Sequence, residues 1–203
     1  MKLILAVLLS LMMSSAFAEH PMTARSSLRE FERLMMPDAD AEATQLLKAD
    51  FKFLQTVGAI PADAVLFVRK GVLLGEALSG RTILVSEELA RKPRGYRLFV
   101  LAHEGSHSQH DDTEASRAFI EEHVSPLATF SEMSVQYQAV RGELQKASKA
   151  RESRADKDAY LALRKAGIDA RQDVIAMFKE HEHADNQWHP SAKDRLFALL
   201  KLK

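Results

Sequence analysis

Strand-like sequence in this chain is confined to one short stretch between residues 61 and 86. Three short runs of β-prone residues lie there, at 64–68, 72–74 and 82–85, and Gly71, Gly75 and Gly80 separate them. Elsewhere the apolar residues recur at helical spacing, which predicts helices over 25–36, 41–57, 96–110, 113–124, 131–165, 170–181 and 191–202. A mainly helical chain with one small sheet of two or three strands belongs to the α+β class.

Composition restricts the range of functions. The sequence contains no internal repeat, low-complexity tract or linker, so we expect residues 19–203 to form a single domain. Its 28 basic residues are balanced by 28 acidic residues. A chain without net charge is not attracted as a whole to phosphate backbones or anionic lipid, so we expect no nucleic-acid partner.

The first 18 residues have the pattern of an export signal. Lys2 precedes an apolar run over residues 3–13, and Ala16-Phe17-Ala18 forms a small-x-small cleavage site. That run is shorter than the roughly 20 residues that span a membrane, so we predict a cleaved signal and no stable membrane anchor. The expected location is the bacterial periplasm or the medium. Because the chain contains no Cys, it forms no disulfide bonds. Its apolar core, with or without a bound metal, must therefore stabilise the fold outside the cytoplasm.

The strongest chemical motif is the HExxH sequence from His103 to His107. It follows the apolar run 98–102, which predicts a buried helix. Residues four apart share one face of a helix, so both imidazoles can reach the same ion. Two neutral imidazoles suit zinc, and Glu104 beside them can accept a proton from a water molecule that the metal activates.

A catalytic zinc ion usually has three protein ligands, and HExxH supplies two. The residues alone leave the third ligand open between Glu152, in a charged helical stretch, and His181 or Glu182 further along the chain. His110 lies close to the face of His103 but two helical turns away, too far to share an ion without a break in the helix.

Three further segments resemble the HtpX and CAAX-prenyl-endopeptidase family of gluzincin metallopeptidases. The stretch 152–169 is similar to that family's E-x-x-A-D…A-G-[YI]-D sequence. The stretch 189–196 is similar to its H-P-[ST]-x-x-x-R-[IL] sequence, and 80–85 to the strand that precedes its zinc helix. The resemblance implies a gluzincin-type fold and one zinc ion per chain. It implies Glu152 as the third ligand, with Asp156 supporting the site from one turn later, so that His181 and Glu182 become part of a surface run.

The strand that resembles the family's edge strand is Thr82, Ile83, Leu84 and Val85. We expect it to form an exposed sheet edge beside the zinc helix, to which an extended polypeptide adds as a further strand. The resemblance also places His189 and Arg195 near the cleft. Either residue can supply a second donor to the developing oxyanion, and the structural alternative for His189 is a bond to a backbone carbonyl or a helix cap.

These observations predict a zinc-dependent endopeptidase that cleaves exported, including misfolded, polypeptides. His103, His107 and Glu152 hold the metal, Glu104 is the general base and His189 assists. One alternative is a metal-binding or chaperone-like protein on a degenerate peptidase domain. Another is a helical interaction module in which HExxH occurs by chance.

Overall fold

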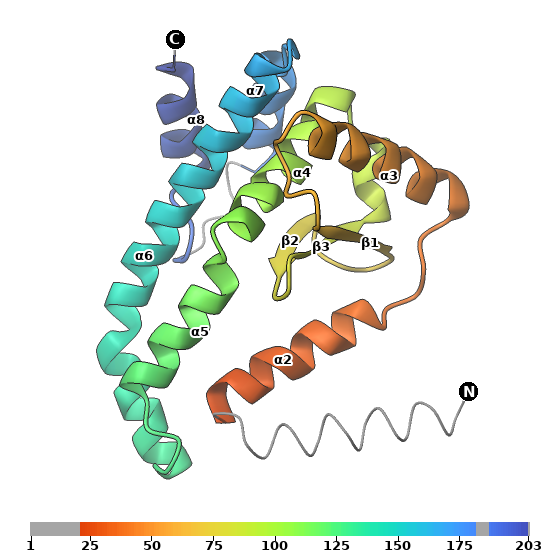
Figure 1. Ribbon diagram of the computed structural model, residues 1–203. Coiled ribbons are helices and arrows are strands. Elements are labelled where there is room, and N and C mark those ends of the chain that lie inside the picture. The colour runs from red at the N-terminus through yellow and green to blue at the C-terminus, as the bar shows by residue number, and fades with distance from the viewer. Residues whose placement is uncertain (1–20, 182–186, 203) are drawn as a thin grey trace, which may run out of the picture.

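The computed structural model describes residues 21–181 and 187–202 (Figure 1). The predicted signal at 1–18, together with Glu182 and His183, therefore lies outside the described residues. The described elements are α2 (Pro21–Leu34), α3 (Ala41–Thr56), β1 (Val65–Arg69), β2 (Gly75–Leu78), β3 (Thr82–Ser86), the 3-10 helix η1 (Glu87–Arg91), α4 (Arg94–Gln109), α5 (Asp112–His123), α6 (Phe130–Lys165), α7 (Arg171–Glu180) and α8 (Ala192–Leu200). The predicted α+β class, mainly helical with a small sheet, is confirmed.

The sheet is mixed, with strand order β1-β3-β2. β1 runs parallel to β3, and β2 runs antiparallel to it. The run 72–74 is not a strand; the second strand is instead Gly75–Leu78.

The prediction that Thr82, Ile83, Leu84 and Val85 form an exposed edge is wrong. These residues lie in β3, which pairs with a strand on each side. Ile83 and Val85 are 0% exposed and Leu84 is 1% exposed. An uninterrupted apolar run is typical of a strand that is buried on both faces. The run 82–85 therefore indicates a central strand rather than an exposed edge. The edge that lies beside α4 is β2.

Helix α4 occupies the centre of the molecule and packs against α3, α6, α7 and the sheet. Its apolar run is buried, with Leu98 and Leu101 both at 0% exposure. Gly105 permits the close approach of another segment. A Cβ atom there would lie 2.6 Å from Cγ1 of Ile60 and 2.9 Å from the carbonyl oxygen of Ala59. The helix that carries HExxH is therefore fixed on all sides.

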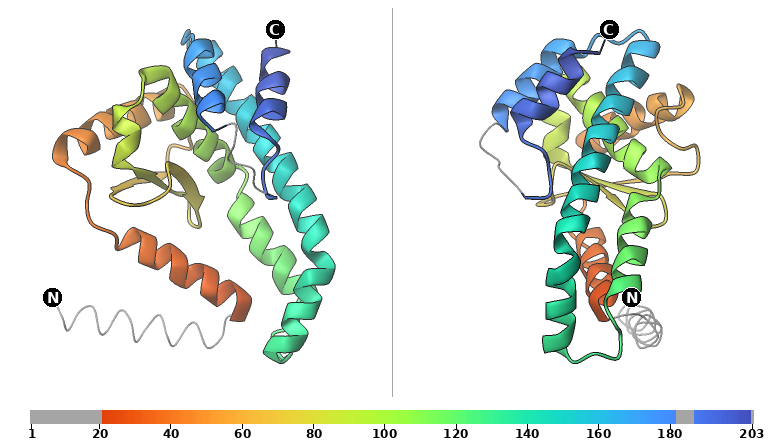
Figure 2. Two further views of the ribbon diagram at one scale, coloured as in Figure 1. Left: turned by 180° about the vertical axis from the view of Figure 1, so that it is seen from behind. Right: turned by 90° about the vertical axis from the view of Figure 1, so that its left-hand side faces the viewer.

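Both faces of the sheet are covered. Because side chains alternate along a strand, Ile83 and Val85 join the main core with α3 and α4, and Leu84 points to the opposite face. Helix α2 runs along that opposite side in both views of the chain (Figures 1 and 2). The N-terminal helix therefore lies next to the sheet, far in sequence from the strands that it covers.

Helices α5 and α6 form a long antiparallel hairpin that extends past the sheet (Figure 2). Thr129 and Glu132 make a reciprocal capping box that starts α6. Along α6, Glu152 and Asp156 are buried one turn apart, and the residue that follows each of them, Ser153 and Lys157, is exposed. The charged stretch predicted from the sequence is therefore amphipathic, with two carboxylates on its inner face.

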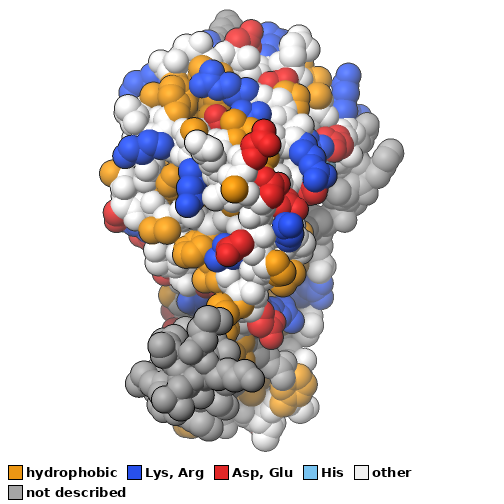
Figure 3. All heavy atoms as spheres, turned by 90° about the vertical axis from the view of Figure 1, so that its right-hand side faces the viewer, with side chains coloured by type: hydrophobic (Ala, Val, Ile, Leu, Met, Phe, Trp, Pro, Cys, Tyr) orange, Lys and Arg blue, Asp and Glu red, His pale blue; other side chains and the backbone are white. Residues whose placement is uncertain are grey.

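No helix among residues 21–181 and 187–202 combines the length and the apolar character needed to cross a membrane. On the face in Figure 3, acidic and basic side chains are interspersed.

Candidate metal centre

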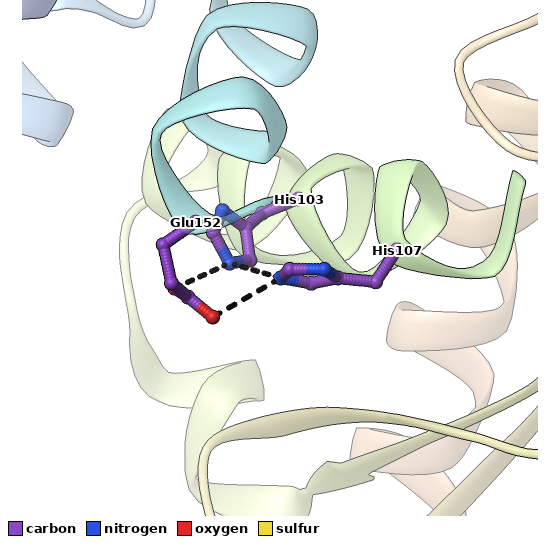
Figure 4. Close-up of side chains that lie close together, drawn as sticks. All are labelled: His103, His107 and Glu152. Carbon is purple, nitrogen blue, oxygen red and sulfur yellow. Dashed lines mark hydrogen bonds and ion pairs between the residues drawn. The ribbon is translucent and has the colours of Figure 1, made fainter. Parts of the chain in front are cut away.

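Two imidazoles and one carboxylate converge between α4 and α6 (Figure 4). The Nε2 atoms of His103 and His107 lie 3.1 Å apart. Oε2 of Glu152 lies 3.4 Å from Nε2 of His103, and its Oε1 lies 3.3 Å from Nε2 of His107. Among the described residues these three form the one group of His and acidic side chains spaced to hold a metal ion.

The spacing of the three side chains matches the ligand set of a zinc ion. Ligand atoms at 2.0–2.1 Å in tetrahedral directions lie about 3.3 Å from one another. The observed separations of 3.1, 3.4 and 3.3 Å are close to this value. The two distances to Glu152 are to its two different oxygens, so either oxygen could complete a three-residue ligand set, and a zinc ion held by three side chains would leave a position for water.

The protonation of the rings points to a cation as well. Nδ1 of His103 lies 3.0 Å from Oδ1 of Asp156, and Nδ1 of His107 lies 2.7 Å from Oδ2 of Asp112. A neutral imidazole that faces a carboxylate through Nδ1 carries its proton there and presents a lone pair at Nε2. Two such lone pairs and a carboxylate then face one another. With both rings neutral, as metal binding requires, this arrangement is repulsive until a cation lies among the three groups, so the donor set fits zinc.

The charge balance of the site supports the same conclusion. Burial lowers the pKa of His103, but Asp156 and Glu152 outweigh that effect and raise it to about 10. The pKa of His107 is also raised, because Asp112 and Glu152 outweigh the effect of burial. The imidazoles in turn hold the pKa of Glu152 well below its usual range despite its burial. The surrounding carboxylates therefore stabilise positive charge at this position.

A second ring of charged residues holds these ligands in place. Arg195 donates two hydrogen bonds of 2.7 Å to Asp156, and Arg154 donates to the carboxylate of Asp112. Asp156 is 2% exposed and Asp112 is 8% exposed. Each carboxylate therefore links an imidazole to arginine in a largely buried setting, which fixes the orientation of both rings.

Two hollows flank the metal centre. One has a volume of about 270 Å³ and is largely apolar, with walls from β2, α4, α7 and the segment before α8. The other has a volume of about 290 Å³ and is more polar, with walls from β2, α4, α5 and α6. Both are lined by the same five residues, Gly75, His103, Glu104, Glu152 and His189. We call the two together the cleft; the metal centre lies at their junction.

Glu104 faces this cleft beside the edge strand. A Cβ atom on Gly75 would lie 3.0 Å from Oε1 of Glu104 and 2.8 Å from Cγ1 of Val100. Glycine at position 75 therefore lets the backbone of β2 approach the Glu104 carboxylate. Within the part of the chain that the structure describes, no hydrogen bond or ion pair to Glu104 is found.

The outer edge of β2 presents unpaired backbone groups to the cleft. The N–H of Ser86 donates to the carbonyl of Leu74 at 3.3 Å. In an antiparallel pair every second residue bonds to the partner strand, so this bond shows which residues of β2 bond to β3. Glu76 and Leu78 consequently bond to β3, and Gly75 and Ala77 turn their N–H and C=O groups outward. The Ala77 carbonyl accepts a hydrogen bond of 3.0 Å from Oγ1 of Thr113. The N–H and C=O of Gly75 and the N–H of Ala77 therefore face outward and are not bonded to β3.

Of the other residues predicted from the sequence, some lie at the metal centre and some do not. His189 lies at the metal centre, with Nδ1 2.9 Å from Oε2 of Glu152, and Arg195 lies 3.5 Å from the same oxygen. His181 ends α7, bonds its own helix through the carbonyl of Met177 and lines the apolar hollow. His110 is 3.5 Å from Asp158 and is not among the grouped ligands. Glu182 lies outside the described residues.

Residues 73–203 match the family model of peptidase family M48. The chain belongs to peptidase family M48. Members of this family are zinc-dependent metallopeptidases, in agreement with the His103, His107 and Glu152 cluster. No curated protein and no solved structure matches the chain.

The M48 match begins just before β2 and includes the whole of α4 to α8. All residues of the metal centre therefore lie within the M48 region, and α2, α3 and β1 precede it. The predicted resemblance is confirmed at the level of this family.

Sequence reasoning missed two residues of the M48 site, Asp112 and Arg154. Asp112 lies in a run of charged residues directly after the zinc helix, where nothing in the spacing singles it out. On a continuous helix it would point about 140° away from His107, at 100° per residue. Instead, α4 ends at Gln109 and Asp111 adopts a left-handed conformation with φ of 50°, which brings Asp112 back toward the ring.

Proposed function

We propose that this chain is a zinc-dependent endopeptidase that cleaves extended polypeptides after export from the cytoplasm. The observation that carries this proposal is the convergence of three elements in one cleft. These are three side chains spaced to hold a metal ion, the unpaired carboxylate of Glu104 and an edge strand with outward-facing backbone groups. The finer assignment to soluble, exported relatives of HtpX rests on the sequence resemblance.

His103, His107 and Glu152 would hold the metal. When bound there, zinc supplies Lewis-acid charge that makes water more acidic and polarises a carbonyl group. Glu104 accepts the proton that the attacking water loses as its oxygen bonds to the carbonyl carbon. Glu104 then delivers that proton to the amide nitrogen as the C–N bond breaks, so that a carboxylate and an amine leave.

Substrate adds to β2 rather than to the strand predicted from the sequence. An extended chain can accept from the N–H groups of Gly75 and Ala77 and donate to the carbonyl of Gly75. Backbone pairing of this kind holds a peptide in an extended form without selecting its side chains. The apolar hollow next to the metal centre then favours an apolar side chain at one position beside the cleaved bond.

His189 and Arg195 are the candidates for a second donor to the oxyanion. Nδ1 of His189 faces Glu152, but the side chain is 40% exposed and lines both hollows, so the other face of the ring can reach a bound substrate. Arg195 is committed to Asp156 through two bonds. We therefore assign stabilisation of the oxyanion to His189 and the support of Asp156 to Arg195.

The alternative function is metal binding without turnover, in a chaperone-like protein. A carboxylate with a structural role in such a protein would be paired with a donor. Glu104 is 8% exposed, and no hydrogen bond or ion pair to it is found among the described residues. This favours a group that exchanges a proton with substrate, and thus an enzyme.

Metal analysis combined with a cleavage assay tests the proposal. The purified mature protein should contain one zinc ion per chain and cleave casein. Chelation should abolish cleavage, and added zinc should restore it. An internal bond of a peptide blocked at both ends should also be cut, which separates an endopeptidase from an exopeptidase. A zinc-loaded protein that leaves casein and the blocked peptide intact would favour the metal-binding alternative.

A further inference from the structure

We propose that α2 and α5 together clamp the edge strand β2 in the position in which it binds substrate, with Glu30 and Arg33 as positioning residues. This inference rests on the proposed function, because it concerns the strand to which the substrate adds. We call Glu30 and Arg33 of α2, with Thr113, Glu114 and Arg117 of α5, the α2–α5 clamp.

The clamp contacts nearly every residue from 76 to 80. From α2, Arg33 pairs with Glu76, and Oε2 of Glu30 accepts a hydrogen bond of 2.6 Å from Oγ of Ser79. From α5, Thr113 donates to the carbonyl of Ala77 at 3.0 Å, and Oε1 of Glu114 accepts from the N–H of Gly80 at 3.0 Å. The contacts cover the strand and the turn that follows it.

Glu30 connects the two helices of the clamp. Its second oxygen, Oε1, accepts a hydrogen bond of 2.7 Å from Nη2 of Arg117 on α5. The Glu30 side chain is only 13% exposed, so these charge-assisted bonds are partly shielded from solvent. One carboxylate therefore joins α2, α5 and the turn after β2.

The strand has few other anchors. β2 is four residues long and has a paired strand on one side alone, and Gly75 contributes no side chain to packing. Gly75, Glu76 and Ala77 are half-buried, whereas the central strand is almost wholly buried from Ile83 to Val85. Leu78 is the one buried apolar side chain of β2, so the polar side-chain contacts contribute much of the order at its outer edge.

The clamp leaves the binding groups accessible. Its contacts to residues 76 and 79 use side chains, and in β2 itself the carbonyl of Ala77 is the one backbone group that it occupies. Both groups of Gly75 and the N–H of Ala77 remain directed outward. The α2 half of the clamp precedes the M48 match, which begins at residue 73, so a helix outside the matched region orders a strand inside it.

The test compares Glu30→Gln and Arg33→Gln with matched variants on the exposed face of α2, Glu32→Gln and Arg29→Gln. Steady-state cleavage of a peptide substrate and hydrogen exchange of residues 75–80 in the zinc-loaded protein are measured for each. We expect KM to rise about fivefold in the Glu30 and Arg33 variants, with kcat and zinc content unchanged. Exchange at 75–80 should become about tenfold faster while α4 remains unaffected.

Arg33→Lys keeps the charge opposite Glu76 and should return both KM and exchange close to wild-type values. Exchange at 75–80 that is equally slow in all variants would overturn the clamp. Faster exchange with unchanged KM would overturn its positioning role. A wild-type protein that cleaves no substrate would refute the proposed function and, with it, the positioning role. Hydrogen exchange at residues 75–80 would then still test whether α2 and α5 hold β2 in place.

Discussion

Nδ1 of His107 lies 2.7 Å from Oδ2 of Asp112, the first residue of the helix after the zinc helix. This contact sets the ring so that Nε2 faces Glu152, and the guanidinium of Arg154 donates to the same oxygen of Asp112. Metal-ligand orientation at His107 thus depends on a residue from a different helix.

Asp112→Asn should weaken zinc binding by about 10- to 100-fold, because the amide orients the ring less strongly and lowers its basicity. Competition with a chromogenic chelator measures this affinity. Asp111→Asn is the matched control, since Asp111 is exposed and Asn tolerates its left-handed backbone. Equal zinc affinity in Asp112→Asn and wild type would show that Asp112 does not orient His107 for metal binding.

Asp156→Ala should lower the free energy of unfolding of the metal-free protein by about 3 kcal/mol, because it leaves Arg195 buried without its bidentate partner. Urea unfolding after chelation separates this effect from metal binding. The control is Asp158→Ala on the same helix. Asp158 is 41% exposed, so the loss of its contacts should cost less than about 1 kcal/mol. Similar losses for both variants would contradict the assigned role of Asp156.

Gly105→Ala should destabilise the protein by about 1–3 kcal/mol, because the new Cβ meets the backbone oxygen of Ala59, which cannot rotate away. Gly142→Ala, in the exposed middle of α6, meets nothing within 4 Å. It should stabilise the protein by about 0.5–1 kcal/mol through helix propensity. Chemical denaturation of the two variants therefore gives shifts of opposite sign if α4 is packed as described.

Ala77→Pro should raise KM while zinc content stays normal, since it removes an outward-facing donor and leaves the β3 ladder intact. Glu76→Pro is the contrasting variant. It removes an N–H that bonds to β3, so it should lower the melting temperature instead. If KM is unchanged in a folded Ala77→Pro protein, substrate does not add to this edge through Ala77.

The local sequence predicted the helices well. Apolar residues at helical spacing located α3 to α8 to within about two residues at each end. Periodicity alone did not select Glu152 and Asp156; the family resemblance implied them, and they lie four residues apart on the buried face of α6.

Pairing partners could not be predicted from local pattern. The runs 72–74 and 82–85 are equally β-prone, but which strand is central depends on contacts with β1 and β2. Gly75 and Glu76 have low strand propensity, and they form the edge strand because α4 and the clamp hold them there. Asp112 could not be predicted for a similar reason, because the left-handed backbone at Asp111, and not a helical repeat, brings it next to His107.

The central claim is that a metal held by His103, His107 and Glu152 acts together with Glu104 as a base. The most direct test is the rate of casein cleavage by Glu104→Gln at measured zinc content, with the exposed Glu143→Gln as control. We expect one zinc ion per chain in all three proteins and a loss of about 10²-fold or more in the cleavage rate of Glu104→Gln alone. A zinc-loaded Glu104→Gln protein that cleaves casein as fast as wild type would contradict it.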